Sequence, residues 1–347
     1  MTSILITGGQ GYVGSTLARQ LAARGVRVTV VDNSLVPGAR IAGSRVTYVA
    51  GDIREPGEWQ SALRGADAVI HLAAVVGDPA CGLDTDLAWQ TNYVGTVRVA
   101  EACQKAGVAT LVFASTCSNY GATENDEEVD IWSPLNPQSV YAQSKIMAEH
   151  YLLSLAGSAL NAHILRFATV HGLSDRMRFD LAVNVMTAHA VSRGEVAVHG
   201  GRQWRPFLHV QDAARALQAA TDSTVPTLYN CGSGEENYQM AQIGEIIARE
   251  IPGTRVTVQD EAADPRNYRV NFERIRRDRL FQRRFGVVDS VREIRDAMAH
   301  GRYLDFTDAK YSNFLTAQNS LTARDTLTAA APAGGAHIGM FSPIASV

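Results

Sequence analysis

A glycine-rich loop near the N-terminus constrains the fold more than any other feature of the chain. The mostly apolar segment 3–7 leads into Gly8-Gly-Gln-Gly11-Tyr-Val-Gly14, and a helical pattern then runs to about Arg24. Gly8 would allow a tight turn, Gly11 would leave room for a pyrophosphate, and Gly14 would let the helix pack closely on the strand. The N-terminus of this helix would face the phosphates. The same residues also fit an ordinary turn, so the interpretation depends on the segments that follow.

The second apolar segment ends in an acidic residue. Residues 26–31 are predicted as a strand, and Asp32 follows the loop by about 20 residues, where a carboxylate binds the adenosine ribose hydroxyls of a dinucleotide. An aspartate repels a 2'-phosphate, and no arginine follows Asp32 directly. We therefore expect NAD rather than NADP. A helix cap or a turn is the alternative role for Asp32.

Strand and helix patterns alternate through the first half of the chain. Strands are expected at 46–50, 68–72, 110–114 and 163–167, and helices at 87–105 and 141–155. This alternation predicts an α/β fold with a doubly wound parallel sheet, in which ligands bind at the carboxyl ends of the strands. Asp52, Ala73 and Ser115 each follow a predicted strand closely, so we expect them at that edge.

Composition limits the classes of function. The 347 residues are 46% apolar and 19% charged, with a net charge of -3, which suits a soluble enzyme of one or two domains. No long basic run, bilayer-length apolar stretch or signal-peptide pattern occurs, so we expect a cytoplasmic protein without nucleic-acid or membrane partners. The four cysteines form no Cys-x-x-Cys pair and the nine histidines are scattered, which favours a reducing compartment and no metal.

Tyr141 and Lys145 are spaced so that both side chains share one face of the helix expected at 141–155. An ammonium beside a phenol can lower the phenol's pKa and prepare the hydroxyl to take a proton. The same spacing is also common on solvated helix surfaces. The glycine loop, Asp32 and the strand that leads to Ser115-Thr116 together favour a catalytic pair.

Several segments occur in an order and spacing typical of one family. They are Thr7-Gly-Gly-Gln-Gly-Tyr-Val-Gly14, Asp52-Ile53, His71-Leu-Ala-Ala74, Thr91-Asn92, Ser115-Thr-Cys-Ser-Asn-Tyr-Gly121, Tyr141-x-x-x-Lys145 and Arg205-Pro-Phe-Leu-His-Val-Gln-Asp212. Through them, residues 3–300 resemble the extended short-chain dehydrogenase/reductase family, in the branch of nucleotide-sugar epimerases and dehydratases. The resemblance implies a Rossmann domain at 1–172, to which 206–235 returns, and a smaller, discontinuous C-terminal α+β substrate domain at 173–305. The tail, 306–347, lies outside the resemblance, and its Ala- and Thr-rich composition would allow a loose segment of unknown role.

The resemblance implies roles residue by residue. Tyr141 resembles the catalytic base, Lys145 the residue that holds the nicotinamide ribose and lowers the tyrosine pKa, and Thr116 the residue that hydrogen-bonds the reacting sugar hydroxyl. Asn92 resembles a polar residue beside the cofactor, or else it bonds backbone within the fold. The residues expected at the cofactor are Gly8, Gly11, Tyr12, Val13, Gly14, Asp32, Asn33, Asp52, Ile53, Leu72, Ala73, Ala74, Asn92, Ser115, Tyr141, Lys145 and Phe167.

The two residues after Thr116 bear on the type of reaction. The family's sugar 4,6-dehydratases carry an Asp-Glu pair there, and its decarboxylases tend to carry Glu at the second position, whereas this chain has Cys117-Ser118. Dehydration is therefore disfavoured, and decarboxylation mildly so. Cys117 is a candidate acid or base next to a keto carbon, and its alternative role is a small buried apolar residue.

A substrate that carries a diphosphate needs fixed cations, and arginine binds phosphate in a bidentate way. Arg205 and Arg266 resemble the family's phosphate-binding arginines, and each could instead form a surface ion pair. Further substrate contacts are expected from Thr116, Ser118, Thr169 and Asn184, although Thr169 stands where several relatives carry asparagine.

These expectations converge on an NAD-dependent nucleotide-sugar epimerase, which inverts a sugar hydroxyl, at C4 by default, through a keto intermediate. A keto-sugar reductase or a sugar dehydrogenase would use the same residues, and a scaffold without turnover would need only the nucleotide site. The expected partner is a nucleoside-diphosphate sugar. The family often pairs through two long helices, which implies a homodimer through 87–105 and 141–155.

Overall fold

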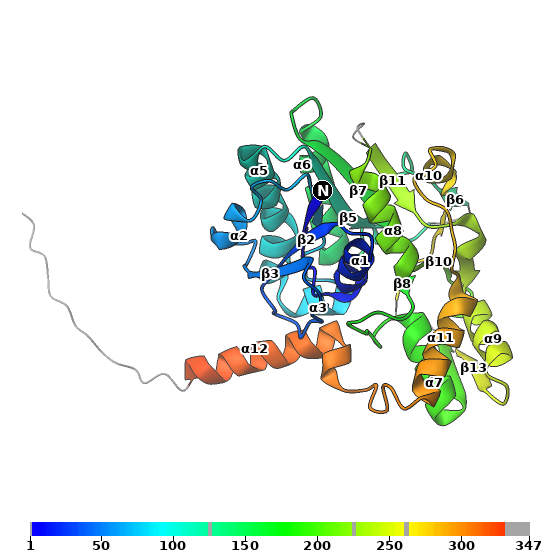
Figure 1. Ribbon diagram of the computed structural model, residues 1–347. Coiled ribbons are helices and arrows are strands. Elements are labelled where there is room, and N and C mark those ends of the chain that lie inside the picture. The colour runs from blue at the N-terminus through cyan, green and yellow to red at the C-terminus, as the bar shows by residue number, and fades with distance from the viewer. Residues whose placement is uncertain (1, 124–126, 224–226, 260–263, 330–347) are drawn as a thin grey trace, which may run out of the picture.

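Seven parallel strands form the central sheet of the protein, in the order β11-β7-β5-β4-β1-β2-β3 (Figure 1). The computed structural model describes residues 2–123, 127–223, 227–259 and 264–329. The strands are β1 (Ser3–Thr7), β2 (Arg27–Asp32), β3 (Val46–Ala50), β4 (Ala68–His71), β5 (Thr110–Thr116), β7 (Asn161–Phe167) and β11 (Thr227–Cys231). The predicted α/β class and the doubly wound Rossmann sheet are confirmed.

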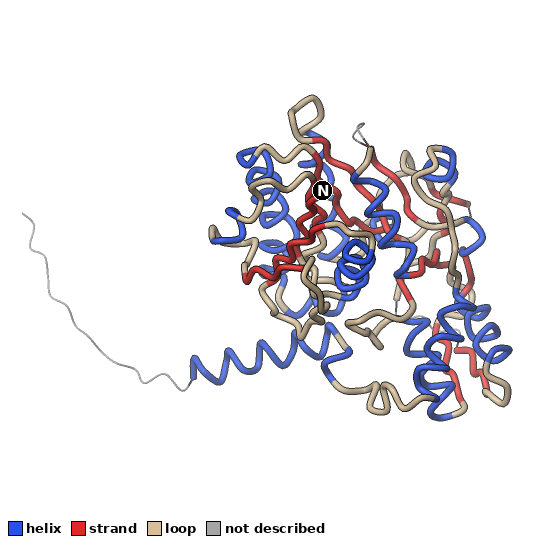
Figure 2. Tube along the Cα trace, in the orientation of Figure 1, coloured by secondary structure: helices blue, strands red, loops and turns tan. Residues whose placement is uncertain are grey.

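Helices cover both faces of this sheet (Figure 2). One face packs on α1 (Tyr12–Ala23) and α8 (Val210–Thr221), which supply Leu17, Leu21 and Leu217 to the core. The other packs on α2 (Glu58–Ser61), α5 (Gly95–Ala106) and α6 (Val140–Ser154). Every residue of β4 is buried, as expected for a central strand covered on both sides. Among the helices that the structure describes, none has the length and apolarity needed to cross a bilayer.

The long helix expected at 87–105 is interrupted by a wider turn. It consists of α4 (Thr85–Trp89), a π-helical segment η1 (Gln90–Val94) and α5, with α3 (Asp78–Leu83) preceding them. Asn92 lies in the π segment and is fully buried. Single π turns inside α-helices often mark functional positions, and periodicity alone does not reveal them.

A smaller body of helices and short strands packs beside the carboxyl ends of the sheet. Helices α7 (Ala182–Arg193), α9 (Met240–Glu250) and α11 (Val287–Ala299) enclose a separate core with the parallel pair β9 (Glu195–His199) and β13 (Arg255–Gln259). A three-stranded sheet joins this body to the main one; it contains β8 (Thr169–His171), β10 (Trp204–His209) and β12 (Asn237–Gln239). The remaining short elements are β6 (Glu128–Val129), β14 (Arg269–Val270), α10 (Glu273–Arg277), η2 (Cys117–Tyr120), η3 (Gly234–Glu236) and η4 (Ala309–Tyr311). The domain boundaries at 172 and 305 stay a proposal.

The part of the tail that the structure describes is ordered by its packing. Residues 313–329 form helix α12 (Asn313–Ala329), which extends beneath the central sheet in the view of Figure 1 and contacts α3. Just before it, Tyr303, Phe306 and Tyr311 pack their rings around Phe179. These aromatic contacts attach the segment to the body, and residues 330–347 of the tail lie outside the described residues.

Candidate active site

The glycine-rich loop between β1 and α1 has a conformation and a packing that only glycine allows. Gly8 has a positive φ of 71°, and a Cβ there would lie 2.6 Å from the backbone nitrogen of Ala73. A Cβ on Gly14 would lie 2.5 Å from the carbonyl oxygen of Gly8. Helix α1 starts directly after Gly11, which has no side chain to cap the first turn. The N–H groups of that turn can therefore bind an anion, so the loop fits a dinucleotide diphosphate.

Asp32 stands at the carboxyl end of β2, beside this loop. Its carboxylate accepts hydrogen bonds from the backbone N–H groups of Gln10 and Ser34, at 3.0 and 2.9 Å. Burial raises the pKa of Asp32, and these two hydrogen bonds act in the opposite direction. The carboxylate is thus oriented toward the cavity edge where an adenosine ribose would lie.

A cavity of about 620 Å³ runs from the glycine loop to the smaller body. It brings together most of the residues that the sequence singled out. Lining it are Gly8, Gly11, Tyr12, Val13, Gly14, Asp32, Asn33, Ile53, Leu72, Ala73, Ala74, Ser115, Thr116, Ser118, Tyr141, Lys145, Phe167, Thr169, Arg205 and Arg266.

Tyr141, Thr116 and Lys145 meet in the middle of this cavity. Ser139 caps α6 by accepting a hydrogen bond from the N–H of Ala142 at 3.2 Å, which places Tyr141 in the first turn. Thr116 ends β5, and its side chain lies close enough to the Tyr141 phenol to lower the phenol's pKa. Lys145 follows one turn later on α6 and is 3% exposed. A proton acceptor, a hydroxyl that orients it and a buried cation thus share one site.

Burial determines the protonation of the catalytic pair. Burial raises the pKa of the Tyr141 phenol, and Cys81 and Asp78 raise this pKa further. Arg178 and Thr116 lower it, but their effect is smaller. The lowered tyrosine pKa that the sequence suggested is therefore wrong for this arrangement.

Lys145 is turned toward β5 instead of toward the phenol. Its Nζ donates to the carbonyl oxygen of Ala114 at 2.9 Å and lies 4.5 Å from the centre of the Phe113 ring. Burial lowers the pKa of Lys145 to about 8, and the opposing influence of Cys81 and Glu149 is smaller.

Four of the predicted residues do not line the cavity. Asn92 instead bonds the backbone of Val75, and Asp52 forms a bidentate ion pair with Arg54 that lowers the pKa of Asp52 to about 2. Asn184 accepts a hydrogen bond from the N–H of Gly172 at 2.9 Å and donates to the carbonyl oxygen of Arg178 at 2.8 Å.

Cys117 is fully buried behind β5; its thiol donates to the carbonyl oxygen of Arg166, and burial raises its pKa. These features favour the alternative role of a small buried residue over that of an acid or base.

The two predicted phosphate-binding arginines share one carboxylate. Nε of Arg266 lies 2.9 Å from Oδ1 of Asp264, and Nη2 of Arg205 lies 3.3 Å from its Oδ2. Nη1 of Arg266 also lies 2.9 Å from Oδ2 of Asp78 and 3.1 Å from Oγ of Ser118. Arg205 is only 7% exposed, so it is a buried cation and not a surface ion pair. Arg266 reaches the catalytic end of the cavity.

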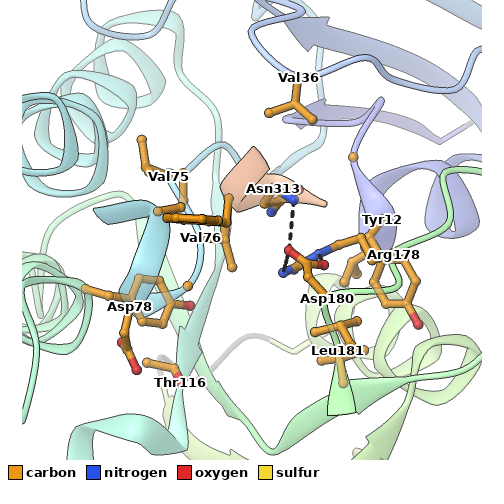
Figure 3. Close-up of a pocket in the computed structure, with 18 of the residues that line it drawn as sticks. Tyr12, Val36, Val75, Val76, Asp78, Thr116, Arg178, Asp180, Leu181 and Asn313 are labelled. Atoms are coloured by element: carbon orange, nitrogen blue, oxygen red, sulfur yellow. Dashed lines mark hydrogen bonds and ion pairs between the residues drawn. The ribbon is translucent and has the colours of Figure 1, made fainter. Parts of the chain in front are cut away.

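Sequence reasoning missed several charged residues that line the cavity, among them Arg176, Arg178 and Asp78. Arg176 and Arg178 precede α7 in a segment that the sequence marks only as basic, and Asp78 begins α3. Asp78 accepts a hydrogen bond from Ser139 at 2.6 Å and lies on the same side of the cavity as Thr116 (Figure 3). No local motif surrounds these residues, and only the chain's packing brings them to the site.

Comparison with known proteins gives a consistent result. Residues 4–232 match the model of the NAD dependent epimerase/dehydratase family. The chain is 31% identical over 266 residues to the UDP-glucose 4-epimerase of Streptomyces lividans, covering 71% of this chain and 80% of the relative. It is 29% identical over 311 residues to the dTDP-glucose 4,6-dehydratase of Streptomyces griseus, covering 84% and 92%. The solved UDP-glucose 4-epimerase of Thermus thermophilus in complex with NAD superposes with a TM-score of 0.75 at 28% identity, covering 85% of this chain and all of that one.

The family match and the site geometry agree. The match spans the glycine loop, Asp32, Thr116, Tyr141 and Lys145, which are the residues that the cavity brings together. The family is NAD-dependent and acts on nucleotide sugars, as the sequence indicated. This protein belongs to the NAD-dependent epimerase/dehydratase family.

Proposed function

We propose that the protein is a nucleotide-sugar epimerase that inverts a sugar hydroxyl, at C4 by default, through a transient keto intermediate. The observation that carries this proposal is the meeting of Thr116, Tyr141 and Lys145 in the cavity that also contains the glycine loop. Inversion needs one acid-base group and a hydride carrier, and it needs no carboxylic acid next to Thr116. The similarity to UDP-glucose 4-epimerases supports the same choice.

Tyr141 takes the proton from the sugar hydroxyl and later returns it. Bound NAD would supply the hydride acceptor and give the hydride back. Thr116 lines the same cavity as the phenol and lowers the phenol's pKa, so a sugar hydroxyl placed between the two would be oriented toward Tyr141 and stabilised as it loses its proton. The Tyr141 pKa is raised by burial, so neighbouring cations must stabilise the phenolate when it forms.

We assign that task to Arg178, and to Lys145 once its side chain turns from Ala114 toward the phenolate. The pKa of Lys145 is about 8, so most of its amine is charged at neutral pH. Arg178 lines the same cavity and favours the ionised phenol. Lys145 would also hold the nicotinamide ribose, since its ammonium carries donors beyond the one directed at Ala114.

The substrate diphosphate would bind at Arg205 and Arg266. Both side chains already hold the carboxylate of Asp264, which stands in for a phosphate group in size and charge. A diphosphate with two such groups would replace Asp264 at one or both arginines. The sugar would then lie between these arginines and Thr116, beside Asp78 and Ser118.

The test is turnover of nucleotide sugars by the purified protein without added cofactor. An epimerase should interconvert a sugar pair such as UDP-glucose and UDP-galactose, with no change in mass, and NMR of the product would identify the inverted carbon. Tyr141→Phe should reduce the rate by about a hundredfold or more, because a positioned acid-base group is lost. Strict dependence on supplied NADH or NADPH would instead indicate a keto-sugar reductase or a dehydrogenase. A product lighter by one water would indicate a dehydratase, and full activity of Tyr141→Phe would contradict the mechanism.

A further inference from the structure

The segment before α12 is attached to the loop that leads into α7. The ring of Phe179 packs edge-on against those of Tyr303, Phe306 and Tyr311, with centroid distances of 5.3, 5.6 and 5.6 Å. The N–H of Phe179 also donates to the carbonyl oxygen of Tyr311 at 2.8 Å. Phe179 lies between Arg178 and Asp180, which both line the cavity, so the C-terminal segment is fixed directly beside the site.

The first residue of α12 is bonded to a carboxylate of the cavity wall. The backbone N–H of Asn313 donates to Oδ2 of Asp180 at 2.8 Å. The same carboxylate receives two hydrogen bonds from Arg178, at 2.8 and 3.1 Å (Figure 3). An anion at a helix N-terminus is electrostatically favourable, and the pairing with Arg178 holds that anion in place.

From this point α12 reaches the opposite wall. Phe314, Ala317, Ser320 and Leu321 line the cavity, and the helix packs on α3. In Figure 3, Asn313 lies between Asp180 on one side and Val75 and Val76, which precede α3, on the other. The helix therefore bridges the two walls of the cavity, with apolar side chains turned inward.

Beneath this bridge lies a cation without a complete set of partners. Arg176 lines the cavity and is 6% exposed, and its Nε donates to the carbonyl oxygen of Pro37 at 3.4 Å. Its Nη2 is buried and has no hydrogen-bond partner among the residues that the structure describes. A buried unpaired donor costs free energy, which a ligand that accepts the hydrogen bond would recover. Because Arg176 sits beside α1 and near Asp32, the acceptor that fits is the diphosphate of NAD.

We propose that α12 is the outer wall of the NAD site, and that Arg176 binds the cofactor's diphosphate beneath it. Phe314, Ala317 and Leu321 cover the dinucleotide, and the bond between Asn313 and Asp180 keeps the helix closed over it. Such a wall retains NAD between turnovers, which a reaction that returns its own hydride requires. The inference rests on NAD use by the family and is independent of the epimerase assignment.

The test is the rate at which NAD leaves the protein, measured without any sugar. Holoprotein is diluted or passed over a desalting column, and the NAD that remains is quantified over time. Three chains are compared: the full chain, a chain that ends at Ala329 and keeps α12, and a chain that ends at Ser312 and lacks it. Loss of α12 should speed NAD release by about tenfold or more, which corresponds to about 1.4 kcal/mol. The chain that ends at Ala329 should match the full chain.

A point substitution tests the same contact without truncation. Asn313→Pro removes the N–H that binds Asp180, together with the Asn313 side chain, and the helix can still form because proline is tolerated at its first residue. The preceding Ser312 has φ -128° and ψ 123°, which suits a residue before proline. NAD release should be several-fold faster than in the full chain, while Gln318→Ala, on the exposed face of α12, should leave it unchanged.

Arg176→Met should weaken NAD binding, measured by titration calorimetry, in the full chain and in the chain that ends at Ser312 alike. Thermal unfolding without NAD checks that each variant is folded. If the chain that ends at Ser312 does not fold, the NAD release rate of Asn313→Pro decides the test. The proposal would be overturned if a folded chain without α12 released NAD as slowly as the full chain. It would also be overturned if Asn313→Pro released NAD as slowly as the full chain.

Discussion

At the scale of single residues, burial opposes the charge that catalysis needs. Lys145 is 3% exposed and its pKa falls to about 8 from an ordinary value of 10.5. Tyr141 is affected in the opposite sense, since burial raises the pKa of its phenol. Both shifts favour the neutral pair. Substrate and cofactor must therefore supply part of the electrostatic environment in which the phenolate and the ammonium coexist.

The Lys145 shift predicts a change of stability with pH. Between pH 8 and about pH 10 the unfolded chain still holds the Lys145 proton while the folded chain has released it, so stability rises with pH. Relative to Lys145→Met, the wild-type free energy of unfolding should increase on the order of 2 kcal/mol across this range. Denaturant unfolding at pH 7.5 and pH 9.5, without NAD, measures the difference. A difference that is flat or falls with pH would contradict the burial argument.

Cys117 illustrates a side chain whose position in the sequence suggests chemistry that its environment excludes. It is fully buried, its thiol donates to the carbonyl oxygen of Arg166 at 3.2 Å, and burial raises its pKa. We expect Cys117→Ala to keep turnover within about threefold of wild type and to lose about 1 kcal/mol of stability through the small cavity it leaves. Initial rates and thermal unfolding measure the two effects. A loss comparable to that of Tyr141→Phe would restore Cys117 as a catalytic group.

At the scale of secondary structure, the π segment η1 holds one wall of the cavity. Asn92 accepts a hydrogen bond from the N–H of Val75 at 2.8 Å and donates to its carbonyl oxygen at 3.0 Å and to Oγ of Ser144 at 3.2 Å. Val75 lines the cavity, and Ser144 precedes Lys145 on α6. The π turn therefore ties the loop after β4 to the catalytic helix.

Asn92→Leu would leave the part-buried N–H of Val75 without this partner, and the Val75 carbonyl oxygen with only the Cys81 thiol. We expect a loss of about 2 to 4 kcal/mol in the free energy of unfolding and weaker NAD binding, because the 72–76 loop would shift. Chemical denaturation and titration with NAD measure the two effects. If stability were retained while only NAD binding fell, Asn92 would be a direct cofactor ligand, as the resemblance implied.

At the scale of the whole molecule, α5 and α6 lie next to each other on one face of the sheet (Figure 1). Met147 and Leu153 on α6 are 40% and 43% exposed. We propose that these helices form the homodimer interface that the resemblance implies, because pairing would cover apolar side chains that now face water.

The double substitution Met147→Glu and Leu153→Glu should convert a dimer into a monomer, since charges at an interface centre cannot be covered without losing water. Light scattering coupled to size-exclusion chromatography measures the mass. Leu304→Glu is the matched control, because Leu304 is apolar and 82% exposed but lies outside α5 and α6. A wild-type monomer, or a double variant that remains dimeric, would exclude this interface.

The parts of the site that the sequence could predict are those encoded locally. The glycine loop could be predicted because its strand, turn and helix are consecutive in the sequence. A Cβ on Gly14 would clash within the loop itself, and a Cβ on Gly8 would clash with the backbone that follows the neighbouring strand. Asp32 and Thr116 end parallel strands, so their place at the carboxyl edge follows from the alternation alone. Tyr141 and Lys145 share a helix face by spacing.

The tertiary structure alone decided which polar side chains reach the cavity. Asn92 and Asn184 are fully buried in bonds to backbone, whereas Arg176 reaches the cavity from far along the chain. Helix α12, which composition left as a loose tail, closes the same cavity through a contact with Asp180. The sequence by itself determined the nucleotide-binding frame and the catalytic pair, because short-range spacing sets both. Their protonation, their surrounding charges and the outer wall of the site depend on burial and on contacts between distant segments, which only the folded chain specifies.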